Sequence, residues 1–432
     1  MANSTATTDT FVYAHWSGMK APVPMGILKS APGKGGLIFS FRYDDKWLKR
    51  KDSFYLDPNL QFYSGPQYPS AGKENFEIFL DSSPDRWGKL LMKRREAAVA
   101  RKEGRKEKQL NELDYLLGVL DGHRMGAMRF KLNEEGPFLN DNKQIASPPW
   151  ATLRDLEYAS LQLEKEDAIN DPEYMKWLAI LIAPGSSLGG ARPKASVMDT
   201  KGRLWIAKFP SGNDERNMGG WEKVTQILAE RCGVIMSEGQ VQKFNSKHHT
   251  FLNKRFDRTE TGERIHFASA MTLLGYKDGA DFKDGVSYME LAEFISRHGA
   301  QPDLDIRQLW KRIVFYICIS NTDDHLRNHG FLLSNKGWIL SPAYDVNPEP
   351  LNKGLTLNIS ETDNSLNLDL AREVAASFRL YPKQAEEIIK EITKAVGQWR
   401  TVATSLQISR EEQEAMSGAF VREEINNQYE IF

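Results

Sequence analysis

Residues 321–345 constrain the fold of this chain more than any other segment, because they combine two acids and an amide with a predicted hairpin. Asp323 precedes Asn328 by five positions. Two apolar triplets follow within 331–340, and a Ser-Asn-Lys-Gly turn separates them. This pattern predicts a pair of antiparallel strands. Such a hairpin would return Asp345 to the neighbourhood of the first loop.

The spacing of Asp323 and Asn328 is that of the catalytic loop of protein kinases. Phosphoryl transfer needs one group that orients the attacking hydroxyl and oxygen ligands for Mg²⁺ at the β- and γ-phosphates. Asp323 would take the first role, while Asn328 and Asp345 would take the second. Asp324 lies only four positions before Asn328, so the spacing selects Asp323. We therefore expect Asp323→Ala to abolish phosphoryl transfer and Asp324→Ala to be mild.

Two other interpretations of this segment stay open from the residues alone. A loop rich in Asp, Asn and His is often a solvated turn. His325 and His329 stand four positions apart, which would suit a metal-hydrolase centre if they shared a helix face. Gly330 follows at once, so a helix at this point is unfavourable and the phosphoryl-transfer interpretation is preferred.

Composition restricts the class of protein but does not select a function. The 432 residues are enough for two or three packed units, and 41% hydrophobic with 27% charged residues is typical of a globular protein. A formal net charge of −1 gives no global electrostatic case for nucleic acid or membrane binding. Cys232 and Cys318 lie in predicted helices, which indicates buried thiols in a reducing compartment. With no signal-peptide pattern and no long apolar run, we expect a cytoplasmic protein.

The N-terminal third is predicted to be rich in strands, followed by a helix and a linker. Pro84 suits the first turn of the helix. The stretch 93–108 is strongly basic, and we favour a solvated helix face over a nucleic-acid patch. The polar, proline-rich stretch 134–150 is predicted to be a linker. Strands are predicted at 11–16, 26–28 and 37–42.

The remainder of the chain alternates strands and helices and then becomes mostly helical from residue 289. The clearest helix begins at Asp305 and leads directly to Asn321. Before it, the pattern predicts a helix at 151–182, a hairpin at 195–198 and 204–209, a helix at 221–232 closed by Gly233, and a strand pair at 241–244 and 250–256.

A glycine-rich loop at 184–194 leads into the hairpin whose second strand carries Lys208. Backbone N–H groups of such a loop can approach phosphate oxygens, and a strand lysine can pair with the α- and β-phosphates. Glu222 on the next helix could hold Lys208 in place. Each feature alone is ordinary: a turn, a strand-edge lysine and a surface glutamate. Their order along the chain, ahead of Asp323 and Asp345, is the stronger argument.

Four segments of the C-terminal two thirds resemble the HipA family of serine/threonine kinase toxins: Ser187–Lys194, Lys254–Arg258, Thr322–Asn328 and Ser341–Val346. The segment Ser83–Gly88 resembles the N-terminal subdomain of the same family. The resemblance therefore spans nearly the whole chain.

The resemblance assigns the nucleotide site to the loop, one strand lysine and a hinge. The hinge would receive adenine through backbone groups. The residues so implied for the phosphates are Gly189, Gly190, Ala191, Arg192, Pro193, Lys194 and Lys208, and those implied for the hinge are Lys254, Arg255 and Phe256.

On the catalytic side, the resemblance implies that Asp323 is the catalytic aspartate, with His325 and Asn328 beside it. Tyr344 and Asp345 would complete the metal site, with Asp345 and Asn328 as Mg²⁺ ligands. Ser187 aligns with the serine that the family autophosphorylates, and Ser186 beside it is the alternative phosphosite. A phosphate there would repel the ATP phosphates and eject the loop.

The resemblance implies an α+β, bilobal protein-kinase-like fold with an extra β-rich N-terminal subdomain. The expected parts are a subdomain and linker at 1–150, a mixed N-lobe at 151–258 and a mostly helical C-lobe at 259–432. ATP and Mg²⁺ would be the cofactors, and a protein serine or threonine would be the acceptor. The family resemblance suggests a translation-related target, such as an aminoacyl-tRNA synthetase. A small helix-turn-helix antitoxin (HipB-like) is the expected partner, with DNA contacted only through that complex.

Two other functions are compatible with these residues. A small-molecule phosphotransferase of the aminoglycoside-kinase type shares the spacing of Asp323 and Asn328 and a metal-binding aspartate. A catalytically inactive corepressor subunit of a DNA-binding complex is the second alternative. Phosphoserine in the loop would discriminate against the first, and ATP turnover against the second.

Overall fold

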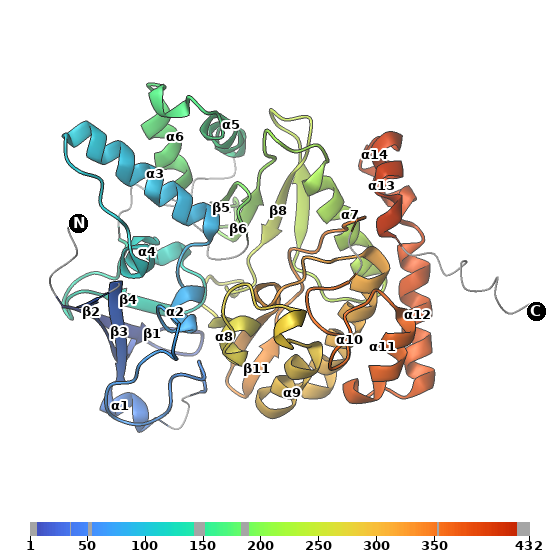
Figure 1. Ribbon diagram of the computed structural model, residues 1–432, viewed down its shortest axis with the longest axis horizontal. Helices are drawn as coiled ribbons and strands as arrows, with labels where there is room; N and C mark the ends of the chain where they lie inside the picture. The colour runs from blue at the N-terminus through green and yellow to red at the C-terminus, as the bar shows by residue number, and fades with distance from the viewer. Residues whose placement is uncertain are drawn as a thin grey trace, which may run out of the picture. The chain divides into compact units, whose positions relative to one another are not determined.

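The computed structural model describes residues 7–34, 36–50, 54–141, 152–182, 190–351 and 354–420 (Figure 1). The chain forms two compact units. The first unit comprises Met1–Asn213 and Leu252–Lys277, and the second comprises Asp214–Phe251 and Asp278–Phe432. The three-part division expected from the sequence stays a prediction.

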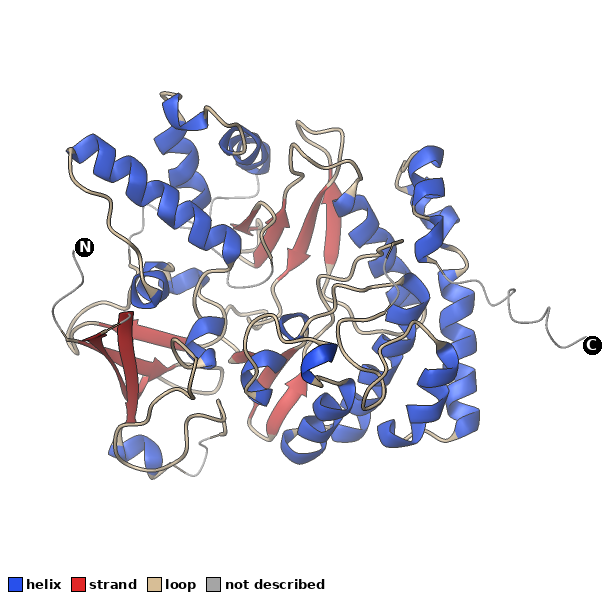
Figure 2. Ribbon diagram, viewed as in Figure 1, coloured by secondary structure: helices blue, strands red, loops and turns tan. Residues whose placement is uncertain are grey.

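An antiparallel sheet with the strand order β3-β2-β1-β4 begins the first unit (Figure 2). Alternate side chains of these strands are buried, including Val12, Leu28 and Phe41, which gives the sheet one apolar face. The three predicted N-terminal strands are confirmed, but the second is much longer than expected. The strands are β1 (Thr8–Ala14), β2 (Val23–Gly33), β3 (Gly36–Tyr43) and β4 (Met128–Lys131).

The positions of two prolines explain why β2 is longer than the predicted 26–28. Pro24 and Pro32 occupy the second and the second-last positions of the strand. A proline near a strand end costs little, since few ladder hydrogen bonds are lost there. The short helices α1 (Asp45–Leu48) and α2 (Glu77–Asp81) follow β3.

Helix α3 (Arg86–Glu103) carries most of the basic stretch. The Asp85 carboxylate caps its start by accepting a hydrogen bond from Gly88 N at 2.8 Å, so Pro84 lies just before the helix and not in its first turn. Gly104 ends the helix in the left-handed conformation with φ 63°. Arg105 then folds back onto Glu96 at 2.6 Å, as expected for a solvated, ion-paired face. Helix α4 (Glu112–Gly118) follows.

The predicted single helix at 151–182 is wrong, because the structure has two helices. They are α5 (Leu153–Leu163) and α6 (Tyr174–Ile182), with a 3-10 turn at Ala168–Asn170 between them. Pro172 lies in the break. A proline lacks the N–H that a helix interior needs and disfavours helical backbone in the residue before it, so one continuous helix cannot form.

The predicted hairpin is confirmed as β5 (Lys194–Met198) and β6 (Leu204–Lys208), paired so that Lys194 faces Lys208. The Asp199 carboxylate closes its turn by accepting from Arg203 N at 2.9 Å. These strands belong to a sheet with the order β5-β6-β8-β7, in which β7 is Gly239–Gln242 and β8 is Thr250–Lys254. The boundary between the two units falls inside β8, between Phe251 and Leu252. The first unit ends with β9 (Phe267–Ser269) and α8 (Ala270–Leu274).

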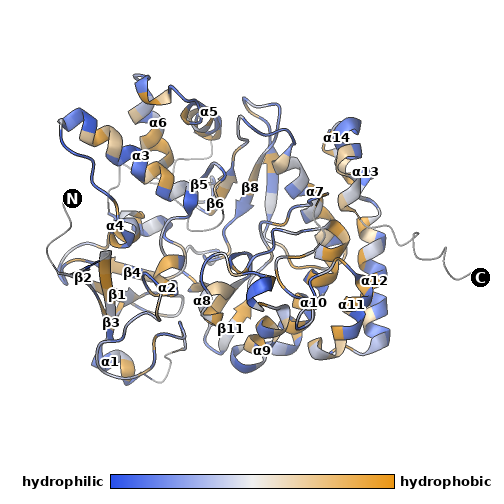
Figure 3. Cartoon of the chain, viewed as in Figure 1, coloured by the Kyte–Doolittle hydropathy of each residue, from blue (hydrophilic) through white to orange (hydrophobic). Residues whose placement is uncertain are grey.

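Helix α10 (Pro302–Ile319) is the centre of the second unit and is buried along nearly its whole length from Asp305 onward. It packs against α9 (Tyr288–His298), α11 (Leu368–Val374) and α12 (Pro382–Val396). In α12 the buried residues recur at helical spacing and Figure 3 shows hydrophilic residues between them. The nearly complete burial of α10 places it inside the unit, whereas the amphipathic α12 covers the surface of the unit.

The predicted helix at 221–232 is confirmed as α7 (Met218–Arg231), followed by Gly233 with φ 73°. Cys232 and Cys318 are both buried and lie outside any disulfide, as predicted. No helix in the described ranges is long and apolar enough to cross a membrane. The remaining elements are β10 (Gly330–Ser334), β11 (Gly337–Leu340), α13 (Trp399–Ser405), α14 (Arg410–Ala415) and 3-10 turns at Asp121–His123, Phe282–Asp284, Leu326–Asn328, Ala375–Phe378 and Ser417–Ala419.

Candidate active site

The loop after α10 is held in a compact shape by its own hydrogen bonds. Helix α10 is followed by its C-cap residue Ser320, a non-glycine residue in the left-handed conformation with φ 51°. The side-chain amide of Asn328 donates to the backbone oxygen of Asp323 at 2.9 Å, and His325 N donates to the same oxygen at 3.0 Å. Asn328 N in turn donates to His325 O at 2.8 Å. These bonds fix Asn328 relative to Asp323, the pair that the sequence spacing selected.

The two neighbouring acids of this loop have opposite environments. The side chain of Asp323 is exposed, whereas Asp324 has 1% exposure. Asp324 Oδ2 accepts hydrogen bonds from the hydroxyl of Tyr288 and from His329 Nε2, the latter at 2.8 Å. An acid that orients a substrate hydroxyl must be accessible, so the geometry favours Asp323. The expectation that Asp324→Ala would be mild is revised, because Asp324 supports the loop from inside.

The support beneath the loop was not visible in the sequence. Tyr288 and His329 are completely buried, and burial, with the nearby carboxylate of Asp324, holds the pKa of Tyr288 well above its usual range. Arg312 is also buried and donates to the backbone oxygen of Ser341, at the exit of β11. Burial lowers the pKa of Arg312. The sequence offered one weak signal for this network, the position of His329 immediately before a predicted strand, and it does not reveal that His329 is buried.

The histidines do not form the metal-hydrolase site that their spacing allowed. Residues Leu326–Asn328 form a 3-10 turn, so His325 and His329 do not share an α-helical face. The Nε2 atom of His329 instead contacts Asp324 Oδ2 at 2.8 Å. Within the described ranges, no group of three or more His, Cys, Asp or Glu side chains could hold a metal ion.

The hairpin returns the second acid to the first loop, as predicted. Strands β10 and β11 pair in the register Leu333 opposite Trp338. Beyond β11, the hydroxyl of Tyr344 donates to the backbone oxygen of Arg327 at 2.7 Å. Asn347 N donates to Asn321 Oδ1 at 3.1 Å. The segment that carries Asp345 is therefore tied at two points to the loop that carries Asp323 and Asn328.

The side chains of Asn328 and Asp345 suit a divalent cation. Asn328 is buried, and its Oδ1 atom has no hydrogen-bond partner in the described part of the chain. Asp345 is half-buried and adopts the left-handed conformation with φ 57°, which non-glycine residues rarely hold without a reason. Amide and carboxylate oxygens are the ligands that Mg²⁺ takes in proteins. The residues present therefore fit the predicted metal site.

Helix α7 is fastened to the segment that follows Asp345. The Thr225 hydroxyl donates to Val346 O at 2.6 Å. Glu222 lies one turn earlier on the same helix and is buried. Glu222 belongs to the second unit and Lys208 to the first, so the expected contact between them stays a prediction.

The predicted phosphate loop is described only in part. Ser186, Ser187 and Gly189 lie outside the described residues. Gly190 and Ala191 are exposed, Arg192 is half-buried and Pro193 is buried. Lys194 is buried, and its ammonium group donates to Asp85 Oδ2 at 2.8 Å and to Gly190 O at 2.9 Å. The Lys194 ammonium group is therefore ion-paired with Asp85, and the assignment of Lys194 to the ATP phosphates stays a prediction.

At the predicted hinge, the Arg255 side chain has a structural role. Its guanidinium pairs with Asp257 at 2.6 Å and is almost completely buried. Arg255 N donates to Leu204 O at 2.9 Å, so this N–H is used by β6. Lys254 and Phe256 are half-buried, and the assignment of their backbone groups to adenine stays a prediction. Lys208, at the end of β6, is also half-buried.

A protein-family match covers the loop, the hinge and the catalytic segment described above. Residues 186–399 match the model of the HipA-like C-terminal domain. The chain contains a HipA-like C-terminal domain. This family region includes the hairpin with Lys208, the hinge and the whole loop that holds Asp323.

One curated relative, from Haemophilus influenzae, is named a putative kinase. It is 28% identical over 188 residues, which cover 38% of this chain and 54% of the relative. The HipA-like chain thus spans about half the length of the curated relative that it matches.

Among solved structures, a chain of the Shewanella oneidensis MR-1 complex of HipA, HipB and operator DNA is similar with a TM-score of 0.63. The identity is 17%, and the match covers 94% of each chain. The predicted HipA-like α+β fold is therefore confirmed. The Helicobacter pylori proinflammatory kinase CtkA matches with a TM-score of 0.35 and 16% identity, over 52% of this chain and 92% of CtkA.

Proposed function

We propose that this chain is a kinase of the HipA type that transfers the γ-phosphoryl group of ATP to a serine or threonine hydroxyl of a protein. The observation that carries the proposal is the loop after α10. There, exposed Asp323 is fixed through its backbone to Asn328, while the adjacent Asp324 is locked inside. The HipA-like domain and the relative named a putative kinase support the same assignment.

Each catalytic group would act from the position described above. The Asp323 carboxylate accepts a hydrogen bond from the acceptor hydroxyl and orients it, an effect worth about 10²- to 10⁴-fold in general acid–base catalysis. Asn328 Oδ1 and the Asp345 carboxylate would hold Mg²⁺, which would offset the negative charge of the phosphates. Lys208 contacts the phosphates, and Glu222 positions it. His325 and Tyr344 line the same region.

The first unit would hold the rest of the nucleotide. The loop at 189–194 surrounds the phosphates with backbone N–H groups. The backbone of Lys254 and Phe256 receives adenine, while the buried ion pair of Arg255 with Asp257 keeps the hinge rigid. In this assignment ATP and Mg²⁺ are the cofactors.

We propose that Ser187 is autophosphorylated and that this step inactivates the enzyme. A phosphate adds about −2 charge at neutral pH, and it would stand in a loop meant for the ATP phosphates. Repulsion then favours a loop that has left the site. Ser186 is the alternative phosphosite.

The proposed partners are a protein substrate and a small HipB-like antitoxin with a helix-turn-helix fold. The similar solved structure contains HipA together with HipB and operator DNA. We propose that DNA is contacted only through the complex with this antitoxin, since the net charge of −1 provides no general attraction to nucleic acid. A translation-related target is proposed on family resemblance alone.

Phosphoproteomics of cells that express the wild type or Asp323→Ala tests the proposal directly. The expected result is a set of phosphoserine or phosphothreonine sites present with the wild type and missing with the variant. Asp363→Ala, at an exposed aspartate of the second unit, is the matched control and should behave as the wild type. Identical phosphoproteomes for wild type and Asp323→Ala, with both proteins folded and expressed, would contradict the proposal.

A further inference from the structure

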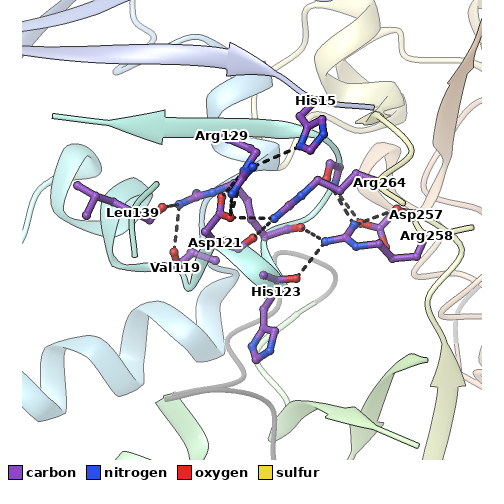
Figure 4. Close-up of polar contacts among 12 residues, drawn as sticks. His15, Val119, Asp121, His123, Arg129, Leu139, Asp257, Arg258 and Arg264 are labelled. Atoms are coloured by element: carbon purple, nitrogen blue, oxygen red, sulfur yellow. Dashed lines mark hydrogen bonds and ion pairs between the residues drawn. The ribbon is translucent and has the colours of Figure 1, made fainter. Parts of the chain in front are cut away.

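The first unit contains a buried cluster of arginines with too few carboxylates to neutralise it (Figure 4). Asp257 pairs with Arg255 and Arg258, each at 2.6 Å. Asp121 pairs with Arg129 at 2.6 Å and with Arg264 at 3.1 Å. Each carboxylate therefore already serves two guanidinium groups.

A fifth arginine, Arg124, adds charge without a carboxylate partner of its own. Its guanidinium donates to four backbone carbonyls, those of Ser82, Leu116, Val119 and Leu139, at 2.7–3.1 Å. Burial lowers the pKa of Arg124 to about 10. Five arginines against two aspartates leave an excess of positive charge in a low-dielectric region, where an anion is bound more strongly than in water.

A pocket of about 220 Å³ opens on this cluster, and all of its lining residues belong to the first unit. Its charged lining consists of Arg203, Lys254, Arg255, Arg258 and Glu260. Two carboxylates outside the lining also pair with these cations: Asp199 with Arg203 at 2.7 Å, and Asp257 with Arg255 and Arg258. Four cations against three carboxylates leave one positive charge in excess around this small space. Ligand pockets for drug-sized molecules are about 300–1,000 Å³, so this one suits a smaller ligand.

Glu260 marks the place where a ligand anion would sit. Its carboxylate lies 2.6 Å from Lys254 Nζ and 4.0 Å from an Arg203 nitrogen. The Glu260 side chain is 72% exposed and lies at the tip of a turn closed by Gly262 N donating to Thr259 O. An ion pair with so exposed a carboxylate contributes little to stability, so a better anion can displace the carboxylate.

We infer that this pocket binds a small phosphoryl-bearing anion, which takes the place of the Glu260 carboxylate between Lys254 and Arg203. A phosphoryl group offers three acceptor oxygens and about two negative charges, against two oxygens and one charge for a carboxylate. It is therefore better able to bridge Lys254 of β8 and Arg203, which lies in the turn between β5 and β6. Arginine guanidiniums bind phosphate oxygens in a bidentate geometry.

The pocket is separate from the proposed phosphate loop. Arg203 immediately precedes β6, and Lys208 ends that strand. Four residue steps at about 3.3 Å per residue place Leu204 and Lys208 about 13 Å apart. The side chain of Lys254 faces the pocket, whereas the proposed adenine contact uses its backbone. The inferred site therefore does not depend on the proposed kinase activity.

Calorimetric titration of the full chain with inorganic phosphate and with pyrophosphate, at constant ionic strength, tests the site. The structure predicts opposite effects for two exposed or half-exposed positions. Arg203→Ala should weaken phosphate binding about fivefold or more, because a cation is lost. Glu260→Ala should tighten it about fivefold, since removing one unit charge near 4 Å is worth about 1 kcal/mol in water.

Lys208→Ala is the control for phosphate bound at the proposed nucleotide site, and it should leave the phosphate affinity unchanged. Three results would overturn the inference. They are the lack of saturable phosphate binding by the wild type, unchanged or weaker binding by Glu260→Ala, and loss of binding in Lys208→Ala but not in Arg203→Ala. Because Glu260 is exposed, its replacement tests the site even if Arg203→Ala perturbs the hairpin turn.

Discussion

Replacement of Asp324 separates the structural acid of the catalytic loop from the proposed catalytic one. Both hydrogen bonds to Asp324 end on the same atom, Oδ2, and come from Tyr288 and His329. A carboxylate only accepts hydrogen bonds, so Nε2 of His329 carries the proton in this contact. Asp324→Ala removes the shared acceptor and leaves two buried donors without a partner.

The expected loss of stability follows from these two donors. A buried polar group left without its partner costs about 1–3 kcal/mol, so two such groups cost about 2–6 kcal/mol. This is a large part of the 5–15 kcal/mol that usually stabilises a folded domain. Asp324→Asn is the matched control, because its amide oxygen can occupy the position of Oδ2 and keep both bonds. We expect it to cost about 1 kcal/mol.

Urea unfolding with linear extrapolation measures the free energy, and phosphoryl transfer is assayed on the same preparations. Asp323→Ala should abolish transfer and change stability by less than about 0.5 kcal/mol, as is usual for an exposed position. Asp324→Ala should lose stability, and any activity it retains should fall with the folded fraction. The reasoning is refuted if Asp324→Ala unfolds within about 0.5 kcal/mol of the wild type.

Three further predictions concern other parts of the two units. Asp345→Ala should weaken Mg²⁺-dependent ATP binding because it removes a charged metal ligand, and an unchanged affinity in a calorimetric titration would contradict that role. Ser187→Asp should bind ATP more weakly and Ser187→Ala should escape self-inactivation; mass spectrometry that finds no phosphate at this loop in active protein would remove the model. Asp257→Ala should destabilise the chain by about 3–5 kcal/mol, because it leaves the buried Arg255 and Arg258 unpaired, and a stability equal to the wild type would show that the pairs do not matter.

The ionisation of Asp257 should also make the free energy of unfolding depend on pH. Burial by itself would raise the pKa of Asp257, but Arg255 and Arg258 outweigh it and lower the pKa to about 2. A depressed pKa contributes stability above the unfolded value near 3.8, and this contribution is lost as the pH falls toward 2. Comparing the wild type with Asp257→Ala between about pH 5 and pH 2 should therefore show the difference in stability shrinking as the acid is protonated.

Local sequence patterns were sufficient to predict the helix, the loop and the hairpin that contain the proposed catalytic residues. The spacing of Asp323 and Asn328, the two apolar triplets and the stripe of α10 depend on neighbours within a few positions, and each predicted the observed local structure. The break between α5 and α6 was also a local signal, since Pro172 forbids the single helix that was expected.

Tertiary structure alone decided what the polar residues do. The spacing to Asn328 distinguishes Asp323 from Asp324, but it does not show that Asp324 is hydrogen-bonded to Tyr288, which is 36 positions away. Arg255, expected at the hinge for its backbone, places its side chain against His123, which is 132 positions away. Hydrogen-bond partners at such separations are set by how the packed core brings segments together, and a desolvated polar group must find one of them. The sequence therefore determined which residues are available, while burial determined which of them hold the fold and which face the substrate.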